Sequence, residues 1–309
     1  MQCLSAEGHT VRGCTRSLAR ARVVSPDLEC VEIGDLASFD GWSPLLKGVS
    51  TVIHTAACAG ATGGVPIATS ALMGVNVAGT LRLANSAAAA GVRRFVFVSS
   101  IKVLGEETFP NEPFRADDRP NPMDDYAMSK AEAEMGLLEI SDRTGLETVI
   151  VRPPMVYGAG AGGNFALLVS MIRRGIPLPL ATATRNRRSL IAVDNLVSVL
   201  SLCATRAAAA NRTFLVSDGI DLSTADLLTR IAGSLGTRAR LFPFPQALLC
   251  AGERMIHRDG LVRRLFGNLQ LDNSQVCSAL GWHPVVSLDL ALAVACRRPA
   301  ERRNMRGRI

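Results

Sequence analysis

The sequence predicts an α/β protein, with a doubly wound parallel sheet followed by a smaller C-terminal lobe. Three observations lead to this fold class. Short apolar runs alternate with helix-forming segments in the first half of the chain, which is typical of a parallel sheet covered on both faces. The rhythm changes after Pro154, where several glycines precede new helical segments. The chain has 309 residues, 48% of them apolar, which is enough for a full core and two lobes.

Five apolar runs predict the strands of the first lobe. The third run is apolar on both faces and ends in small residues, and the fourth is rich in Phe and Val. The fifth stops at Pro153 and Pro154, because proline cannot donate to a strand ladder. The predicted strands cover residues 10–14, 30–35, 50–57, 94–100 and 147–152.

Helix-forming residues occupy the segments between and after these strands. An Ala- and Leu-rich segment predicts a helix from about Met73 to Ala90, closed by Gly91. A second helix carries Tyr126 and continues through Ile140, and a third covers residues 165–174. Gly8 suits the position just past the end of a helix that precedes the first strand.

Composition excludes several function classes. No charge-free apolar stretch reaches the 18 residues of a membrane span. Eight scattered cysteines, without CxxC or zinc-type His pairing, indicate reduced thiols, no metal site and a cytoplasmic protein. Most of the net charge of +7 comes from residues 297–309, which carry six arginines and one glutamate. We interpret them as a solvated basic tail and expect no nucleic-acid binding, because no aromatic residues interleave with these charges.

The most informative motif pairs two scarce residue types. Tyr126 precedes Lys130 by four positions at the start of a predicted helix, so both side chains lie on one helix face. A lysine ammonium beside a phenol favours the phenolate, so we expect Lys130 to lower the pKa of Tyr126 and make it an acid/base group. The structural alternative is a solvated ion-dipole pair on a surface helix.

A serine pair ends the strand that precedes this motif. Ligands of parallel α/β sheets bind at the carboxyl ends of strands, where Ser99 and Ser100 are expected. Both hydroxyls are candidates for a hydrogen bond to a reacting oxygen. We prefer Ser100, on the basis of the resemblance described next.

This ordered set of motifs resembles the extended short-chain dehydrogenase/reductase family. The matching features are Ser100, Tyr126-x-x-x-Lys130 and residues 52–57 and 76–80, and within the family the chain is most similar to NAD-dependent epimerase/dehydratases of the UDP-glucose 4-epimerase type. The resemblance implies a Rossmann-like fold. It also implies that Tyr126 is the acid/base, that Lys130 holds the nicotinamide ribose and that Ser100 hydrogen-bonds the reacting oxygen.

The resemblance also implies binding residues for NAD or NADP and for a UDP-sugar. Asp35 matches an acidic residue that contacts adenine, and Arg16 stands where it could accept a 2′-phosphate, so the choice between the two cofactors stays open. Asn164 and Arg188 match residues near the substrate diphosphate, with a helix N-cap and a surface charge as their structural alternatives. The other expected cofactor contacts are Ala56, Ala57 and Asn76.

The two residues after Ser100 reduce the number of reactions that we expect the chain to catalyse. Family members that dehydrate sugars carry an Asp-Glu pair there, whereas this chain has Ile101 and Lys102, so dehydration is disfavoured. We expect C4 epimerisation of a UDP-sugar or reduction of a UDP-4-keto-6-deoxy-sugar, in bacterial polysaccharide precursor synthesis. One alternative is a non-catalytic Rossmann-like scaffold that has lost its cofactor. Another is a steroid- or flavonoid-type reductase, which shares the Tyr/Lys chemistry but has no need of the diphosphate residues.

The start of the chain departs from the family pattern. The family begins with a strand and a glycine-rich turn that cradles the cofactor pyrophosphate, and this sequence has neither. We expect an N-terminal truncation relative to the family, from a late start or from degeneration. The expected domains are a dinucleotide-binding lobe over 1–155, a mainly substrate-binding lobe over 156–296 with some segments returning to the first, and the tail 297–309. The segments 73–90 and 128–140 are candidates for a homodimer face, as in the family.

Overall fold

The computed structural model describes residues 1–309 except 25–26, 60, 63–64, 256–259 and 298–309. The chain forms two compact units. Unit 1 comprises Met1–Val103, Pro120–Arg152 and Val197–Phe214, and unit 2 comprises Leu104–Arg119, Pro153–Leu196 and Leu215–Ile309. The chain therefore passes from unit 1 to unit 2 after Val103, Arg152 and Phe214, and segments of each unit interrupt the other. All of the expected basic tail except Arg297 lies outside the described residues.

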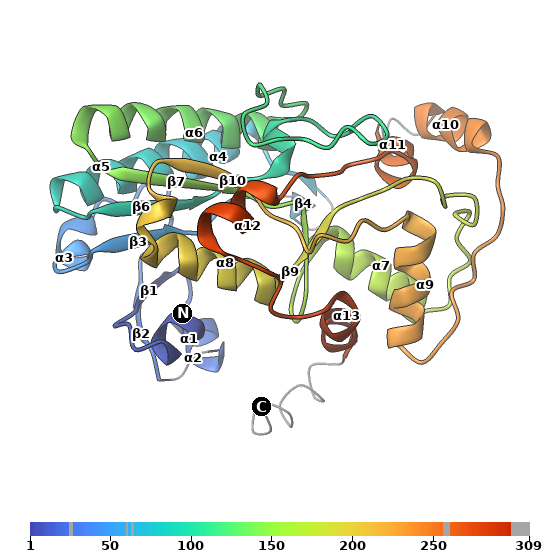
Figure 1. Cartoon of the computed structure of the whole chain (residues 1–309), viewed down its shortest axis with the longest axis horizontal. Coiled ribbons are helices and arrows are strands. Elements are labelled where there is room, and N and C mark those ends of the chain that lie inside the picture. The colour runs from blue at the N-terminus through green and yellow to red at the C-terminus, as the bar shows by residue number, and fades with distance from the viewer. Residues whose placement is uncertain (25–26, 60, 63–64, 256–259, 298–309) are drawn as a thin grey trace. The chain divides into compact units, whose positions relative to one another are not determined.

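Unit 1 is built on parallel strands, as the sequence predicts (Figure 1). A four-stranded sheet has the order β10-β7-β6-β3, and β1 and β2 form a separate parallel pair. In the larger sheet Thr51 pairs with Arg94, and Arg94 pairs with Glu147. Its strands are β3 (Thr51–His54), β6 (Arg94–Val98), β7 (Glu147–Arg152) and β10 (Arg212–Leu215); the separate pair is β1 (Arg12–Thr15) and β2 (Glu29–Glu32).

Helices cover both faces of the larger sheet. Phe95 and Phe97 of β6 are fully buried in a core cluster with residues of α3, α5 and α6, whereas the intervening Val96 is buried on the opposite face. The remaining elements of unit 1 are α1 (Gln2–Ala6), α2 (Leu18–Val24), α3 (Trp42–Leu46), β4 (Ala61–Thr62), β5 (Val65–Pro66), α4 (Thr69–Leu72), η1 (Met73–Gly79), α5 (Thr80–Ala89), η2 (Ile101–Val103), α6 (Asp125–Thr144), η3 (Ala207–Ala209) and the later part of α8 (Val193–Thr205).

Local sequence signals fix the ends of the helices next to β6. Asp124 caps α6 by accepting a hydrogen bond from the Ala127 amide at 2.8 Å, and Gly145 ends the helix in the left-handed conformation at φ 75°. The predicted helix over 73–90 is more complex than expected, because its first part, η1, is a π-helix. π-Helical turns are uncommon and occur often at functional sites.

Unit 2 has a helical core around two short strands. β8 (Met155–Tyr157) and β9 (Leu190–Ala192) pair in parallel, and α7, α9 and α13 contribute the largest part of the surrounding apolar cluster. Residues 104–119 join this unit through bridges from Thr108 to Asn268 and from Phe114 to Leu271. The further helices are α7 (Gly163–Arg173), α9 (Thr224–Ser234), α10 (Gln246–Met255), α11 (Leu261–Phe266), α12 (Ser274–Leu280) and α13 (Leu288–Cys296).

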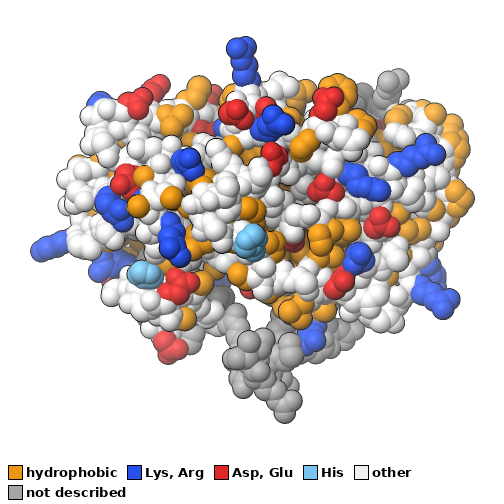
Figure 2. Space-filling view, viewed as in Figure 1, with side chains coloured by type: hydrophobic (Ala, Val, Ile, Leu, Met, Phe, Trp, Pro, Cys, Tyr) orange, Lys and Arg blue, Asp and Glu red, His pale blue; other side chains and the backbone are white. Residues whose placement is uncertain are grey.

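Surface charges do not form a single patch on the visible face. Figure 2 shows Lys and Arg side chains interspersed with Asp and Glu over the described residues of that face. No helix in the described part of the chain is long and apolar enough to cross a lipid bilayer.

A buried arginine ties the end of α8 to the sheet of unit 1. The side chain of Arg94 is fully buried, donates to the carbonyls of Cys203 (2.9 Å) and Arg206 (2.7 Å), and pairs with Glu147 at 2.7 Å. The carbonyls at a helix C-terminus lack partners within the helix, so this guanidinium satisfies them. Neighbouring Arg93 approaches Glu147 only to 3.8 Å and has 54% of its side chain exposed.

We predict that Arg94→Met lowers the free energy of unfolding by about 3–5 kcal/mol, because it leaves buried carbonyls and a partly buried carboxylate unpaired. Urea denaturation measures the change. Arg93→Met is the matched control, with an expected loss of about 0–1 kcal/mol. Equal losses in the two variants would contradict the assigned role of Arg94.

Candidate active site

The carboxyl end of β6 brings together the three predicted catalytic residues. Ser100 follows this strand directly, Tyr126 is the second residue of α6, and Lys130 lies one turn further along the same helix. The side chains of Ser100 and Tyr126 are joined by a hydrogen bond. The competing candidate, Ser99, is 3% exposed and its hydroxyl has no hydrogen-bond partner in the described structure, whereas Ser100 is the serine bonded to Tyr126.

The expected effect of Lys130 on Tyr126 is wrong for this structure. Burial raises the pKa of Tyr126 to about 12, the Asp124 carboxylate adds to the rise, and the hydrogen bond with Ser100 opposes it. Lys130 is not among the groups that set this pKa. The phenol is therefore protonated at neutral pH in this structure.

Lys130 is itself strongly perturbed. Its side chain is 1% exposed, Nζ donates to the carbonyl of Val98 at 2.8 Å and lies 4.4 Å from the centre of the Phe97 ring. Burial lowers the pKa of Lys130 to about 8, while the nearby Glu134 carboxylate favours the charged form. An ammonium has three N–H donors, and the Val98 carbonyl is the one acceptor described for Lys130. The other donors can bind hydroxyl groups such as those of a ribose.

Asn76 lies on η1, and its side chain makes hydrogen bonds to other groups of the protein. Its Nδ2 donates to the Cys58 carbonyl and to Ser129 Oγ, both at 2.9 Å, and its Oδ1 accepts from the Cys58 amide at 2.7 Å. Ser129 Oγ in turn donates to the Tyr126 carbonyl at 2.8 Å. Asn76 therefore connects the loop after β3 to the first turn of α6, which carries Tyr126.

The other expected cofactor residues follow the carboxyl ends of the strands in unit 1. Arg16 and Asp35 are exposed after β1 and β2, and Ala56 and Ala57 follow β3. The Asp35 carboxylate also accepts from the Ala37 amide at 3.0 Å, as in an Asx turn.

Unit 2 carries the two expected diphosphate residues. Asn164 is exposed in the first turn of α7, and Gly162 rather than Asn164 is the N-cap. Arg188 is half-buried, and its Nη1 donates to the Gly267 carbonyl at 3.0 Å. Burial lowers the pKa of Arg188 to about 10, against the effect of the acidic residues Glu106 and Glu107. Arg188 is therefore not the exposed surface charge that was its structural alternative.

Sequence reasoning missed a buried ion pair beside Lys130. Glu134 accepts from Arg152 Nη2 at 2.6 Å and Nε at 3.0 Å, and both side chains are less than a tenth exposed. The signal was present in the sequence, because an acidic residue four positions after Lys130 on a helix shares its face. This pair joins α6 to β7 directly behind the lysine.

The fold and this site define a Rossmann-type α/β protein with a Ser/Tyr/Lys arrangement at a strand end. The model of the NAD dependent epimerase/dehydratase family matches residues 1–217, and the chain belongs to that family. A curated relative, UDP-glucose 4-epimerase of Vibrio cholerae, is 39% identical over 274 residues, which cover 88% of this chain and 84% of the relative.

Two solved structures share the fold of this chain. UDP-glucose 4-epimerase of Thermotoga maritima, in a structure with UDP-glucose, has a TM-score of 0.78 to this chain, with 20% identity over 99% of this chain and 94% of that one. UDP-glucuronic acid 4-epimerase of Bacillus cereus, in complex with NAD, has a TM-score of 0.75 and 18% identity over 95% of this chain and 89% of that one. These likenesses confirm the predicted fold class.

We predict that Lys130 makes stability depend on pH between about 8 and 10. Its folded pKa of about 8 lies below its ordinary value of 10.5, so in this range the unfolded chain binds more protons and stability from this group rises with pH. The slope is at most about 1.4 kcal/mol per pH unit. Urea denaturation of the wild type and of Lys130→Met gives the difference in unfolding free energy at each pH.

That difference should increase from pH 8 to pH 10. Lys47→Met, which removes an exposed lysine, serves as the control for losing one lysine from the chain. A flat difference for Lys130→Met would show that the buried ammonium does not titrate in this range.

Proposed function

We propose that this protein catalyses oxidoreduction at C4 of a UDP-sugar, as a 4-epimerase. The observation that carries the proposal is the hydrogen-bonded Ser100–Tyr126 pair, with buried Lys130 one helical turn away, at the carboxyl end of a central strand. The relative from Vibrio cholerae, at 39% identity, supports the 4-epimerase reaction over other reactions of the family.

The side chains divide the proton chemistry between them. Tyr126 exchanges one proton with the substrate: as phenolate it accepts the proton of the C4 hydroxyl when C4 is oxidised, and as phenol, its form at neutral pH in this structure, it donates that proton to the C4 carbonyl oxygen when C4 is reduced. Ser100 hydrogen-bonds Tyr126 and orients the same oxygen. Bound NAD or NADP supplies hydride transfer.

The described residues fit the nicotinamide side of such a cofactor. The remaining Lys130 donors suit a ribose diol, and Asp35 and Arg16 follow the strand ends where the adenosine half would lie. Asn76 keeps both Nδ2 protons on protein acceptors, so we assign it to positioning the Tyr126 turn. Ala56 and Ala57, after β3, present little side chain and allow close approach of a ligand.

In unit 2 we assign Arg188 and Asn164 to the substrate diphosphate. A half-buried guanidinium suits phosphate because it stays charged and offers several fixed donors. Asn164 stands in the first turn of α7, where backbone amides lack helical partners and anions are favoured.

This chain lacks the acid/base pair that dehydration of a sugar requires after Ser100. Ile101 is 2% exposed and Lys102 is ion-paired with Asp124, so the two residues after Ser100 offer no carboxyl group for eliminating water. Reduction of a UDP-4-keto-6-deoxy-sugar uses the same three residues and is the second candidate. Either reaction would serve bacterial polysaccharide precursor synthesis.

We predict that the purified protein, supplied with NAD, interconverts UDP-galactose and UDP-glucose. Chromatographic separation of the two sugars measures the conversion, and titration of NAD and NADP by protein fluorescence measures cofactor binding. Conversion only of a UDP-4-keto-6-deoxy-sugar, with consumption of NADPH or NADH, would instead establish the reductase. Absence of cofactor binding would support a non-catalytic scaffold.

We predict that Tyr126→Phe lowers turnover at least about 100-fold, with cofactor affinity within about twofold of the wild type, because the proton-transferring hydroxyl is lost while the ring stays. Tyr157→Phe is the matched control. Tyr157, the other tyrosine, is buried in unit 2 and donates to Asp218 at 2.7 Å, so this change should affect stability rather than the chemical step. Wild-type turnover by Tyr126→Phe would refute the role of the phenol.

A further inference from the structure

A buried carboxylate in unit 2 is tied to the helix that follows Gly260. Glu106 has 5% of its side chain exposed, and its Oε2 accepts a hydrogen bond from Arg263 Nη2 at 2.7 Å. Its Oε1 lies 3.5 Å from Arg264 Nη2. Both arginines belong to α11, and all of these residues lie in unit 2. An ionised group this deeply buried is costly unless it is paired, so the pair with Arg263 holds α11 against the segment 104–119.

The same helix ends next to the carbonyl that holds Arg188. The Gly267 amide, just past α11, donates to the Arg263 carbonyl at 2.7 Å, and the Gly267 carbonyl accepts from Arg188 Nη1 at 3.0 Å. A series of hydrogen bonds through Arg263 thus joins Glu106 to the Arg188 guanidinium. The backbone of Arg188 is held separately, because its amide and its carbonyl both pair with Leu222. The series therefore acts on the direction of the Arg188 side chain rather than on its backbone.

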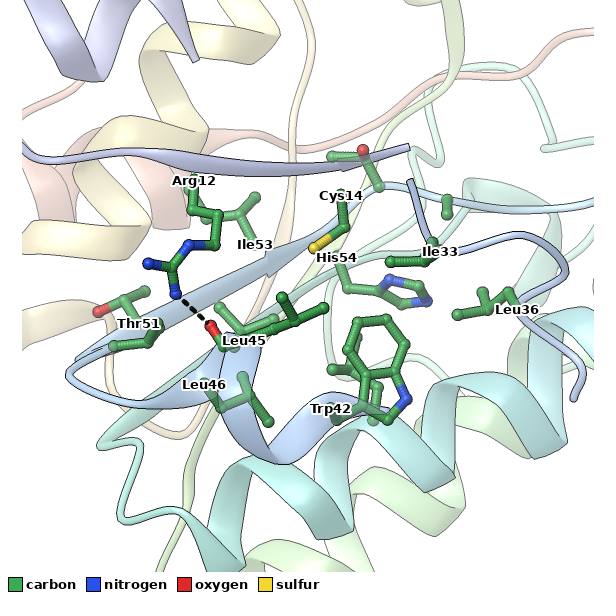
Figure 3. Close-up of a pocket in the computed structure, with 15 residues that line it drawn as sticks. Arg12, Cys14, Ile33, Leu36, Trp42, Leu45, Leu46, Thr51, Ile53 and His54 are labelled. Atoms are coloured by element: carbon green, nitrogen blue, oxygen red, sulfur yellow. Dashed lines mark hydrogen bonds between the residues drawn. The ribbon is translucent and has the colours of Figure 1, made fainter. Parts of the chain in front are cut away.

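Arg188 keeps donors for a ligand, unlike Arg12 in unit 1. Arg12 Nε pairs with Glu29 at 2.6 Å, and its Nη1 donates to the Leu45 carbonyl at 2.8 Å, beside the unit 1 pocket drawn in Figure 3. One guanidinium there takes both a carboxylate and a carbonyl. In unit 2 the two partners are divided, because Arg263 takes the carboxylate and Arg188 the carbonyl. Among the described residues Arg188 forms no ion pair, so its charge and remaining donors stay available to an anion.

Other contacts keep the end of α11 in place if the ion pair is lost. The Leu265 carbonyl accepts from Thr224 Oγ1 at 2.6 Å and from Asn186 Nδ2 at 3.3 Å. Asn186 Nδ2 also lies 3.4 Å from the Gly267 carbonyl. Removing the charge of Glu106 should therefore shift the end of the helix without detaching it from unit 2.

We propose that Glu106 is a positioning residue for the substrate diphosphate, because its carboxylate fixes Arg263 and so directs Arg188. The inference rests on the proposed function, in which Arg188 binds the diphosphate of a UDP-sugar. The carboxylate has two effects of opposite sign on anion binding. As a negative charge near Arg188 it repels a diphosphate, whereas as the anchor of α11 it holds the guanidinium in place. The anchoring effect is the larger one.

The test titrates UDP itself into the whole chain and its variants by calorimetry. Glu106→Gln keeps the size of the side chain and removes its charge. It should weaken UDP binding about fivefold to tenfold, because the ion pair that anchors α11 is lost. A merely structural role would lower the thermal midpoint and leave the affinity for UDP unchanged.

Glu107→Gln is the matched control. It removes the same charge from the next residue, which also acts electrostatically on Arg188 but is exposed and forms no ion pair within the described part of the chain. Its affinity for UDP should stay within about twofold of the wild type. The affinity for NAD should be the same in both variants and the wild type.

Arg263→Met removes the other half of the ion pair. This side chain is 41% exposed, so the variant tests the link even if the change at Glu106 lowers stability. It should weaken UDP binding by a similar factor. The double variant Glu106→Gln/Arg263→Met should bind UDP no more weakly than either single variant, because both changes break one contact.

Unchanged or tighter UDP binding by Glu106→Gln would show that the carboxylate acts through its charge alone. An equal loss in Glu107→Gln, or single losses that multiply in the double variant, would show that Arg263 does not carry the effect. Each of these results overturns the role of Glu106 and leaves the proposed function intact. Absence of UDP binding by the wild type would instead refute the substrate assigned to Arg188, and the role of Glu106 with it.

Discussion

The hydrogen bond from Lys130 to the Val98 carbonyl is the interaction on which the candidate site depends. It fixes the first turns of α6 against the last residue of β6, and so it sets where Tyr126 stands relative to Ser100. An ammonium is rarely buried this deeply without a counter-charge. Glu134 supplies one, and because Arg152 holds that carboxylate in a bidentate pair, the charges behind the lysine form a chain that links α6 with β7.

Most of the fold of unit 1 could be predicted from the sequence, because buried parallel strands appear as apolar runs closed by small residues or proline. The predicted strand over 50–57 is shorter in the structure, where β3 ends at His54, since the ladder with β6 stops there. The sequence could not reveal that residues 104–119 join unit 2. That placement depends on bridges to Asn268 and Leu271, more than 150 residues away, and no local pattern encodes them.

The site was predictable in its residues and less so in its electrostatics. Spacing alone put Tyr126 and Lys130 on one helix face, and the structure agrees. The pKa of Tyr126 depends instead on how deeply the phenol is buried and on the Asp124 carboxylate, and neither quantity can be inferred from a motif. Asn76 illustrates the same limit, because its partners are the backbone of Cys58 and a serine 53 positions away.

The π-helix η1 has a consequence for how this chain can vary in length. In a π-helix the backbone bonds span one residue more than in an α-helix, so a seven-residue π segment carries a local surplus of chain. A deletion of one residue between Met73 and Gly79 could be absorbed by a return to α-helical winding, and the helix would survive. The cost would fall on Asn76, whose side chain would turn away from Cys58 and Ser129. A one-residue deletion in this segment would therefore change the support of the Tyr126 turn while leaving the fold intact.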